Sequence, residues 1–328
     1  RLPAIAGVRP IAPEVPYGVD ALLVEASRSQ DQARAFPLTA GAQVWLGVRR
    51  MHALAHPGLR MLLLTDGGAA TRPALELGAQ IARMAHARTT ILGWGEAQTL
   101  QPHLQRLREE FGPGLPALDA HTADDDLSVA LAAEIERQPY DLAVISTQPP
   151  HNDDLAMQLL REGEQHLLLV PRAQPLPERV LICVATGEPG KDDVQFAARL
   201  LRHLGASATV LSVLASTASQ LDRERTERFV EAGVRSLTLL GVPAESRLRS
   251  GPVRQEIVAE MAAGGYGMLV LGTPPMGRDG RAALAGVVGE ILTAITEQAV
   301  LLVRSQSVAQ RRWHVTSRQA VNLEELTR

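Results

Sequence analysis

Residues 272–290 have the composition and order of a phosphate-binding loop, with three glycines in the first nine positions. An apolar run at 266–271 precedes them and an apolar-periodic segment follows, an order that predicts a strand, a loop and a helix. Glycines let backbone N–H groups approach a phosphate closely, and a helix start presents unpaired donors. The expected donors are Thr273, Gly277, Gly280 and the helix start at Val287 to Gly289, with Arg278 or Arg281 supplying charge. The other interpretation is a plain crossover loop whose arginines face solvent.

Few other residues are arranged for catalysis. Only His52 and His56 share helical spacing, and they precede Pro57 without a nearby carboxylate, which favours a linker surface over a metal site. The acidic cluster at 124–126 precedes an apolar-periodic segment and is most simply a helix cap. No Gly-x-Ser-x-Gly elbow is present. The sequence therefore predicts no catalytic residue and no metal site.

Composition narrows the class of protein. The chain has 328 residues, of which 45% are hydrophobic, so it can form two or three domains. A net charge of -3 argues against nucleic acid or an acidic membrane surface as a partner. The single cysteine, Cys183, rules out an intrachain disulfide, and no apolar run reaches the length of a bilayer span. We expect a cytoplasmic protein without membrane insertion in this chain.

The chain contains an internal repeat in two unequal copies. Residues 60–92 and 179–211 each read as strand, turn, amphipathic helix and strand, and they align without a gap at a spacing of 119 positions. Both copies continue with a helix and then a strand expected to start at Tyr140 or Tyr266, and each closes with an apolar strand. Apolar strands alternating with helices predict an α/β fold with parallel sheets. The expected divisions are a β-rich N-terminal segment (1–58), a first domain (59–173), a second domain (178–304) and a C-terminal tail (305–328).

This order resembles tandem domains of the universal stress protein family. The resemblance rests on the strand order, the Asp-Gly turn after the first strand, the glycine loop after the fourth and the closing Leu-Leu-Val strand. It implies two Rossmann-like five-stranded domains that pair about a two-fold axis through their last strands. Two copies in one chain would form that pair internally, and further association into a homodimer is open.

In the nucleotide-binding branch of that family, an Asp ends the first strand near the adenine, and a Gly-x2-Gly-x9-Gly-Ser/Thr loop holds the phosphates and ribose. The second copy keeps Gly272 and Gly286, but Pro275 replaces the second glycine and the spacing is one residue longer. Gly277 or Gly280 would have to substitute. Val287 stands where the loop needs a hydroxyl, and losing that donor should weaken phosphate binding.

The carboxylate is absent from the second copy, where Ala185 occupies its place. The first copy ends its first strand with Thr65 and Asp66, which we treat as a remnant of the site, but no glycine loop follows its fourth strand. Each copy therefore keeps half of a nucleotide site.

The two ends differ from the repeat. Residues 41–52 resemble the end of a TOBE domain, a small barrel attached to some transporter ATPases, although a β-hairpin packed on the first domain explains them equally. The polar tail is expected to dock loosely; the alternative is a docking peptide anchored by Trp313.

Three hypotheses for function follow. The leading one is a non-catalytic regulatory or stress-response protein that acts as a binding platform, with a degenerate nucleotide site. The second is an adenine-nucleotide sensor that holds ATP or AMP in the second copy. The third is a cytosolic regulatory module of a membrane transporter.

Overall fold

The computed structural model describes residues 59–123, 127–148, 154–186, 188–273, 284 and 286–304. Several predicted features lie outside these residues. They are the β-rich N-terminal segment, the C-terminal tail, the acidic cluster at 124–126 and most of the glycine loop, including Gly277 and Gly280.

The first copy contributes five strands, four α-helices and one short 3-10 helix within the described residues. Its strands are β1 (Arg60–Thr65), β2 (Arg88–Trp94), β3 (Ala117–Ala123), β4 (Leu142–Ser146) and β5 (His166–Val170). Its helices are η1 (Ala69–Thr71), α2 (Arg72–Met84), α3 (Ala97–Phe111), α4 (Leu127–Arg137) and α5 (Asp154–Glu162). Helix α2 starts with a proline in its first turn, where the missing N–H costs no hydrogen bond.

The second copy repeats the pattern. Its strands are β6 (Arg179–Cys183), β7 (Ser207–Leu214), β8 (Ala244–Ser250), β9 (Met268–Thr273) and β10 (Ala299–Arg304). Its helices are α6 (Glu188–Leu204), α7 (Gln220–Leu239), α8 (Val253–Gly264) and α9 (Val287–Ala294). Helix α7 begins at a capping box, in which the Ser219 hydroxyl accepts from the Asp222 N–H and the Asp222 carboxylate accepts from the Ser219 N–H.

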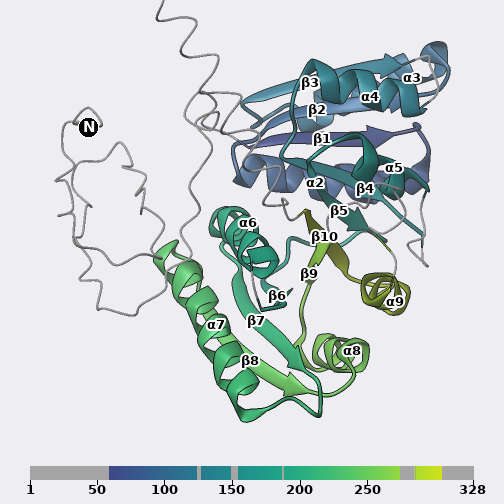
Figure 1. Cartoon of the computed structure of the whole chain (residues 1–328). Helices are drawn as coiled ribbons and strands as arrows, with labels where there is room; N and C mark the ends of the chain where they lie inside the picture. The colour runs from purple at the N-terminus through teal and green to yellow at the C-terminus, as the bar shows by residue number, and fades with distance from the viewer. Residues whose placement is uncertain are drawn as a thin grey trace, which may run out of the picture.

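All ten described strands form one sheet in the order β3-β2-β1-β4-β5-β10-β9-β6-β7-β8 (Figure 1). Strands within each copy run parallel, and the two copies meet where β5 pairs antiparallel with β10, with Leu168 opposite Leu301. The predicted α/β fold with parallel sheets is confirmed.

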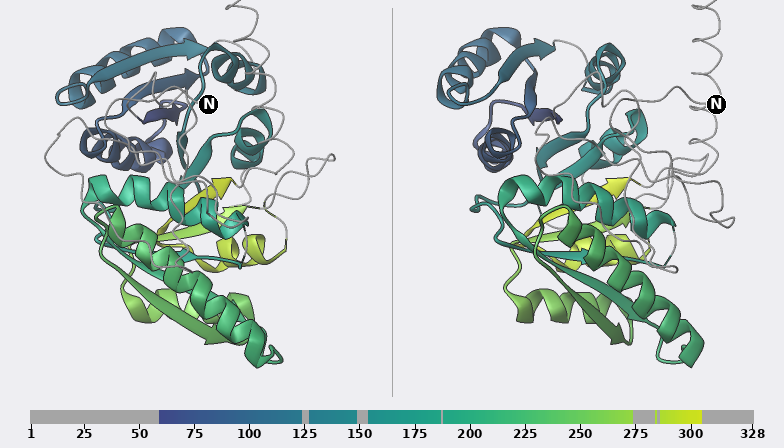
Figure 2. Two further views of the ribbon diagram at one scale, coloured as in Figure 1. Left: turned by 60° about the vertical axis from the view of Figure 1, so that its left-hand side comes forward. Right: turned by 90° about the vertical axis from the view of Figure 1, so that its left-hand side faces the viewer.

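The core lies in two layers, one on each face of the sheet. Alternate residues of β1 show this, because Met61 and Leu63 belong to the layer that includes residues of helices α2, α3, α6 and α7, while Leu62 and Leu64 belong to the layer that includes residues of α4, α5, α8 and α9. Figure 2 shows the helices of the second copy on either side of its strands. Burial on both faces explains why the central strands are continuous apolar runs.

Polar contacts reinforce the junction of the two copies. The neutral ring of His166 accepts at Nδ1 from the Arg304 N–H at 3.0 Å and contacts the Phe196 ring, with the ring centroids 3.7 Å apart. Burial lowers the pKa of His166 to about 3, so this acceptor persists at neutral pH. The Arg172 guanidinium pairs with Glu297 across the same junction at 2.5 Å.

Candidate functional site

Each copy has one topological switch point, at which ligands of doubly wound sheets usually bind. In the first copy it lies between β1 and β4, and in the second between β6 and β9. The carboxyl ends of these strand pairs define two regions, which we call the first and second crevices. They are built from the residues after β1 and β4 and from the residues after β6 and β9, respectively.

The first crevice contains the remnant Thr65 and Asp66. Thr65 is fully buried, and its hydroxyl accepts from the Gly67 N–H at 3.0 Å and lies 2.8 Å from the Thr71 hydroxyl. Asp66 is exposed, and its Oδ1 accepts from the Gly68 N–H at 2.8 Å. Gly67 has a φ of 81°, which a glycine adopts at little cost. The Asp-Gly turn thus satisfies its own donors.

At the start of helix α2, a backbone N–H is likewise bonded within the protein. The Ser146 hydroxyl, at the end of β4, accepts from the Ala74 N–H at 3.0 Å. This N–H belongs to the first turn of α2, where donors have no partner within the helix. A donor that an anion would need is therefore already bonded to a side chain of the same copy.

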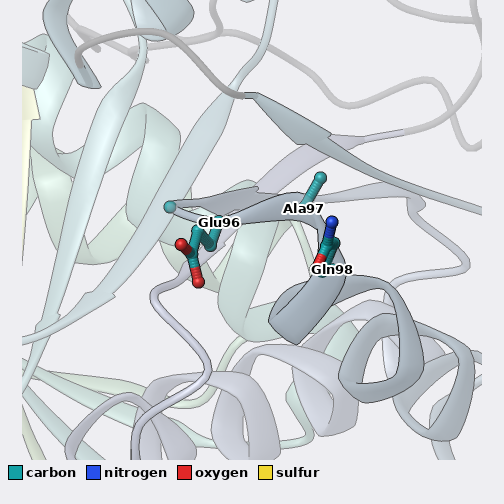
Figure 3. A pocket seen from close by; sticks show the side chains of 4 residues that line it. Glu96, Ala97 and Gln98 are labelled. Carbon is teal, nitrogen blue, oxygen red and sulfur yellow. The ribbon is translucent and has the colours of Figure 1, made fainter.

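A shallow hollow lies beside this crevice, at the carboxyl end of β2. It is lined by Gly95, Glu96, Ala97 and Gln98, at the start of helix α3 (Figure 3). The side chains of Glu96 and Ala97 point away from each other in that view. The hollow thus brings together no set of groups directed at one ligand.

The second crevice contains most of the predicted nucleotide-binding residues. Ala185 is exposed just after β6, and Gly272 and Thr273 end β9. The Thr273 hydroxyl is buried and donates to the Val303 carbonyl of β10 at 3.2 Å, so this hydroxyl is engaged within the sheet.

Gly286 and Val287 mark the start of helix α9, as predicted. Gly286 is the N-cap with a φ of 65°, and as a glycine it gives the helix no side-chain cap. Val287 is 46% exposed and presents methyl groups where a hydroxyl would serve a phosphate.

Asp193 is a residue of the second crevice that the sequence pattern did not single out. It lies on α6, is only 2% exposed, and its Oδ1 has no hydrogen-bond partner among the described residues. Its carboxylate lies against Gly272, because a Cβ built there would be 2.4 Å from Asp193 Oδ2. Burial, and then the neighbouring Asp192, raise the pKa of Asp193 well above its usual value.

The two crevices fill the space between the helix and the strand with different residues. Ala74 and Ser146 in the first copy occupy the places of Asp193 and Gly272 in the second. In the first copy the polar side chain extends from the strand to the helix, and in the second it extends from the helix to the strand.

Two buried glutamates, also missed from the sequence, form matching networks in the two copies. Glu134 accepts a hydrogen bond from the Tyr140 hydroxyl, and Glu260 accepts one from the Tyr266 hydroxyl at 2.9 Å. Both tyrosines precede the strands that we expected them to start, β4 and β9. Their rings are buried, and their hydroxyls serve the glutamates.

The Glu134 network predicts a loss of stability in acid. Burial opposes ionisation of Glu134, but hydrogen bonds from neighbours outweigh it and lower the pKa from 4.5 to about 2. These neighbours are His121, Arg137, Tyr140 and Gln138. A depressed pKa stabilises the fold above pH 4.5, and this contribution is lost as the pH falls towards 2.

We expect this contribution to be roughly 3 kcal/mol in wild type and absent in Glu134→Gln. Urea unfolding at a series of pH values should therefore show a smaller acid loss in the variant, although the variant is less stable at neutral pH. Equal acid slopes in the two proteins would contradict the role of Glu134.

Among the described residues, no helix is long and apolar enough to cross a membrane. In that part of the chain, no group of three or more His, Cys, Asp or Glu side chains is arranged to hold a metal ion.

No family model matches the sequence, and no curated protein matches it either. The fold is similar to several solved structures. A functionally unknown protein of Pseudomonas aeruginosa PAO1 is 18% identical, with a TM-score of 0.60 over 77% of this chain and 95% of that protein. A universal stress protein of Archaeoglobus fulgidus DSM 4304 is 12% identical, with a TM-score of 0.55 over 76% of this chain and 97% of that protein.

The cytoplasmic domain of a prokaryotic cation chloride cotransporter has the same fold. It is 10% identical, with a TM-score of 0.51 over 76% of this chain and 96% of that domain. These likenesses agree with the strand order and the paired sheets described above. The chain has the universal stress protein fold, in two copies joined edge to edge.

Proposed function

We propose that this chain is a non-catalytic regulatory protein of the stress-response type that acts as a binding or signalling platform. One observation carries the proposal: side chains of the protein itself occupy both crevices. Ser146 caps helix α2 in the first copy, and Asp193 fills the space beside Gly272 in the second. Among the described residues, one arrangement takes up a helix N–H and the other places an acid, and both disfavour an adenine nucleotide.

The electrostatics of the second crevice support the same proposal. A phosphate needs N–H donors or cations, whereas the buried side chain beside Gly272 is an acid. Val287 supplies methyl groups in place of a hydroxyl, and Ala185 supplies no carboxylate for an adenine or ribose.

Calorimetric titration of ATP and AMP into the purified chain at neutral pH tests this proposal. We expect no heat beyond dilution and no nucleotide in the purified protein by absorbance and chromatography. Binding at micromolar strength would instead favour the adenine-nucleotide sensor. In that case Gly286→Asp should abolish the affinity, because it places a carboxylate at the start of helix α9.

A second candidate function is a cytosolic regulatory module of a membrane transporter. The likeness to the cytoplasmic domain of a cation chloride cotransporter favours it, since that domain covers 76% of this chain. A cytoplasmic location fits both candidates. Sequencing the gene on both sides of this region separates them, because membrane spans in the same reading frame would support the module. A further homodimer of this chain stays a prediction.

A further inference from the structure

The junction of the two copies contains a histidine whose ring contacts the other copy. His166 lies at the start of β5 and is partly buried. Its Nδ1 accepts from the Arg304 N–H of β10 at 3.0 Å, and its ring lies against the Phe196 ring of α6, with the centroids 3.7 Å apart. Both partners belong to the second copy. The imidazole therefore links the two copies.

The opposite end of the same strand pair is built without an imidazole. The two-fold symmetry of the antiparallel pair places Ala299 at the position of His166 and Pro171 at the position of Arg304. Proline has no N–H, so that end needs no acceptor there. Packing of β5 on β10 does not in itself require a titratable ring. The His166 end calls for a further explanation.

The charges around the ring oppose its protonation. Burial, and then the charges of Arg199 and Arg304, lower the pKa of His166 well below its usual value. Two acids are close to these arginines. Asp141 lies 3.8 Å from the Arg199 guanidinium, and Glu164 acts electrostatically on Arg304. In the part of the chain that the structure describes, neither acid forms an ion pair with the ring.

Protonation would remove the acceptor that the junction uses. Both nitrogens of an imidazolium are donors, so an Nδ1–H of His166 would face the Arg304 N–H. The proton would also add a positive charge beside two arginines of the second copy. Opening the junction relieves both effects, because the ring then reaches water, where an imidazole takes up a proton at about pH 6.5.

We propose that His166 makes the closure of the junction between the two copies depend on pH. The neutral ring holds β10 against β5, and a proton taken up in mild acid shifts the equilibrium towards an open junction. This inference does not involve the crevices, so it goes beyond the proposed function and is tested separately. It gives the chain a signal that acts on the contact between its two copies.

The direction of the effect follows from linkage. Because the pKa of His166 is lower in the closed junction than in water, closure is fully favoured above about pH 6.5 and weakens as the pH falls below that value. Between about pH 7.5 and about pH 5, the ratio of closed to open junction should fall roughly tenfold or more. The acid loss expected from Glu134 lies below this range.

Hydrogen exchange of the β5 and β10 amides, corrected for the intrinsic exchange rate at each pH, measures this ratio. In wild type we expect the protection of both strands to fall roughly tenfold or more between about pH 7.5 and about pH 5. His166→Asn keeps an acceptor near the position of Nδ1 but does not titrate, so its protection should stay nearly constant. His166→Phe keeps a ring, should also lose the pH dependence, and serves if His166→Asn does not fold.

His86→Asn is the matched control. It removes an exposed imidazole of the first copy at a φ of 49°, a conformation that asparagine tolerates, and should keep the pH dependence of wild type.

Two results would overturn the proposal. One is an equal loss of protection in wild type and in a folded His166 variant. The other is an equal loss in β1 and β7 of wild type, because the proton would then act on the whole fold and not on the junction. Binding of ATP or AMP at neutral pH would overturn the proposed function and leave this inference intact.

Discussion

Glu260→Ala should lower the free energy of unfolding by about 3 kcal/mol, the low end of the range for breaking a buried ion pair. Glu260 is 1% exposed and accepts from the Arg249 Nε at 2.9 Å and from the Tyr266 hydroxyl at 2.9 Å. Truncation leaves a cavity and removes one acceptor of the buried Tyr266 hydroxyl. The loss stays at the low end because the side chain of Arg249 is 34% exposed and water can solvate its charge.

Urea unfolding followed by circular dichroism measures this change. The matched control is Glu256→Ala on the same helix, since Glu256 contacts the same arginine at 3.4 Å and is more exposed. We expect it to cost less than about 1 kcal/mol. A similar loss in both variants would mean that the buried network contributes no more than a surface ion pair.

The second large effect concerns the pair that fills the second crevice. Gly272→Ser should destabilise the chain by about 2–3 kcal/mol, because its Cβ would lie 2.4 Å from Asp193 Oδ2. The strain is steric only, since Gly272 is not among the residues with positive φ. The Asp193 carboxyl group is only 2% exposed, so it cannot turn into solvent without moving its packed neighbours.

Asp193→Ala should rescue this variant. The double variant recreates the Ala74 and Ser146 pair of the first copy, in which a strand hydroxyl accepts from a helix N–H. We expect a coupling energy of about 2 kcal/mol in the double-mutant cycle, within the range for residues in contact. Additive effects of the two substitutions would show that the two positions do not share one space.

The sequence predicted the central strands well, for a physical reason. Strands buried on both faces are continuous apolar runs, as in 61–64 and 300–303, and such runs are distinct from the helices between them. The resemblance implied five strands in each copy, but the residues of the edge strands β3 and β8 were not located, because these strands are half exposed and mostly polar, as in Ala244–Ser250. Their place is fixed by pairing with β2 and β7, which a local pattern does not contain.

The candidate site was predicted only in part. The start of helix α9 and the ends of β6 and β9 followed from glycine spacing and apolar runs. The role of Asp193 did not follow from the sequence, because an acid on an amphipathic helix usually faces solvent. A signal was nevertheless present: in the aligned repeat, Ala74 becomes Asp193 and Ser146 becomes Gly272, so a polar group lost at one position is gained at the other.

The antiparallel junction of β5 and β10 also bears on how the two copies could diverge. In a dimer of identical subunits, every substitution appears twice, once on each side of the symmetry axis. Here one polypeptide encodes both halves, so each side can change without its twin. The junction stays assembled at any dilution. One crevice can have a helix N–H bonded to a serine hydroxyl, while the other has a buried acid. Fusion thus turns a symmetric pair into two independently adjustable halves.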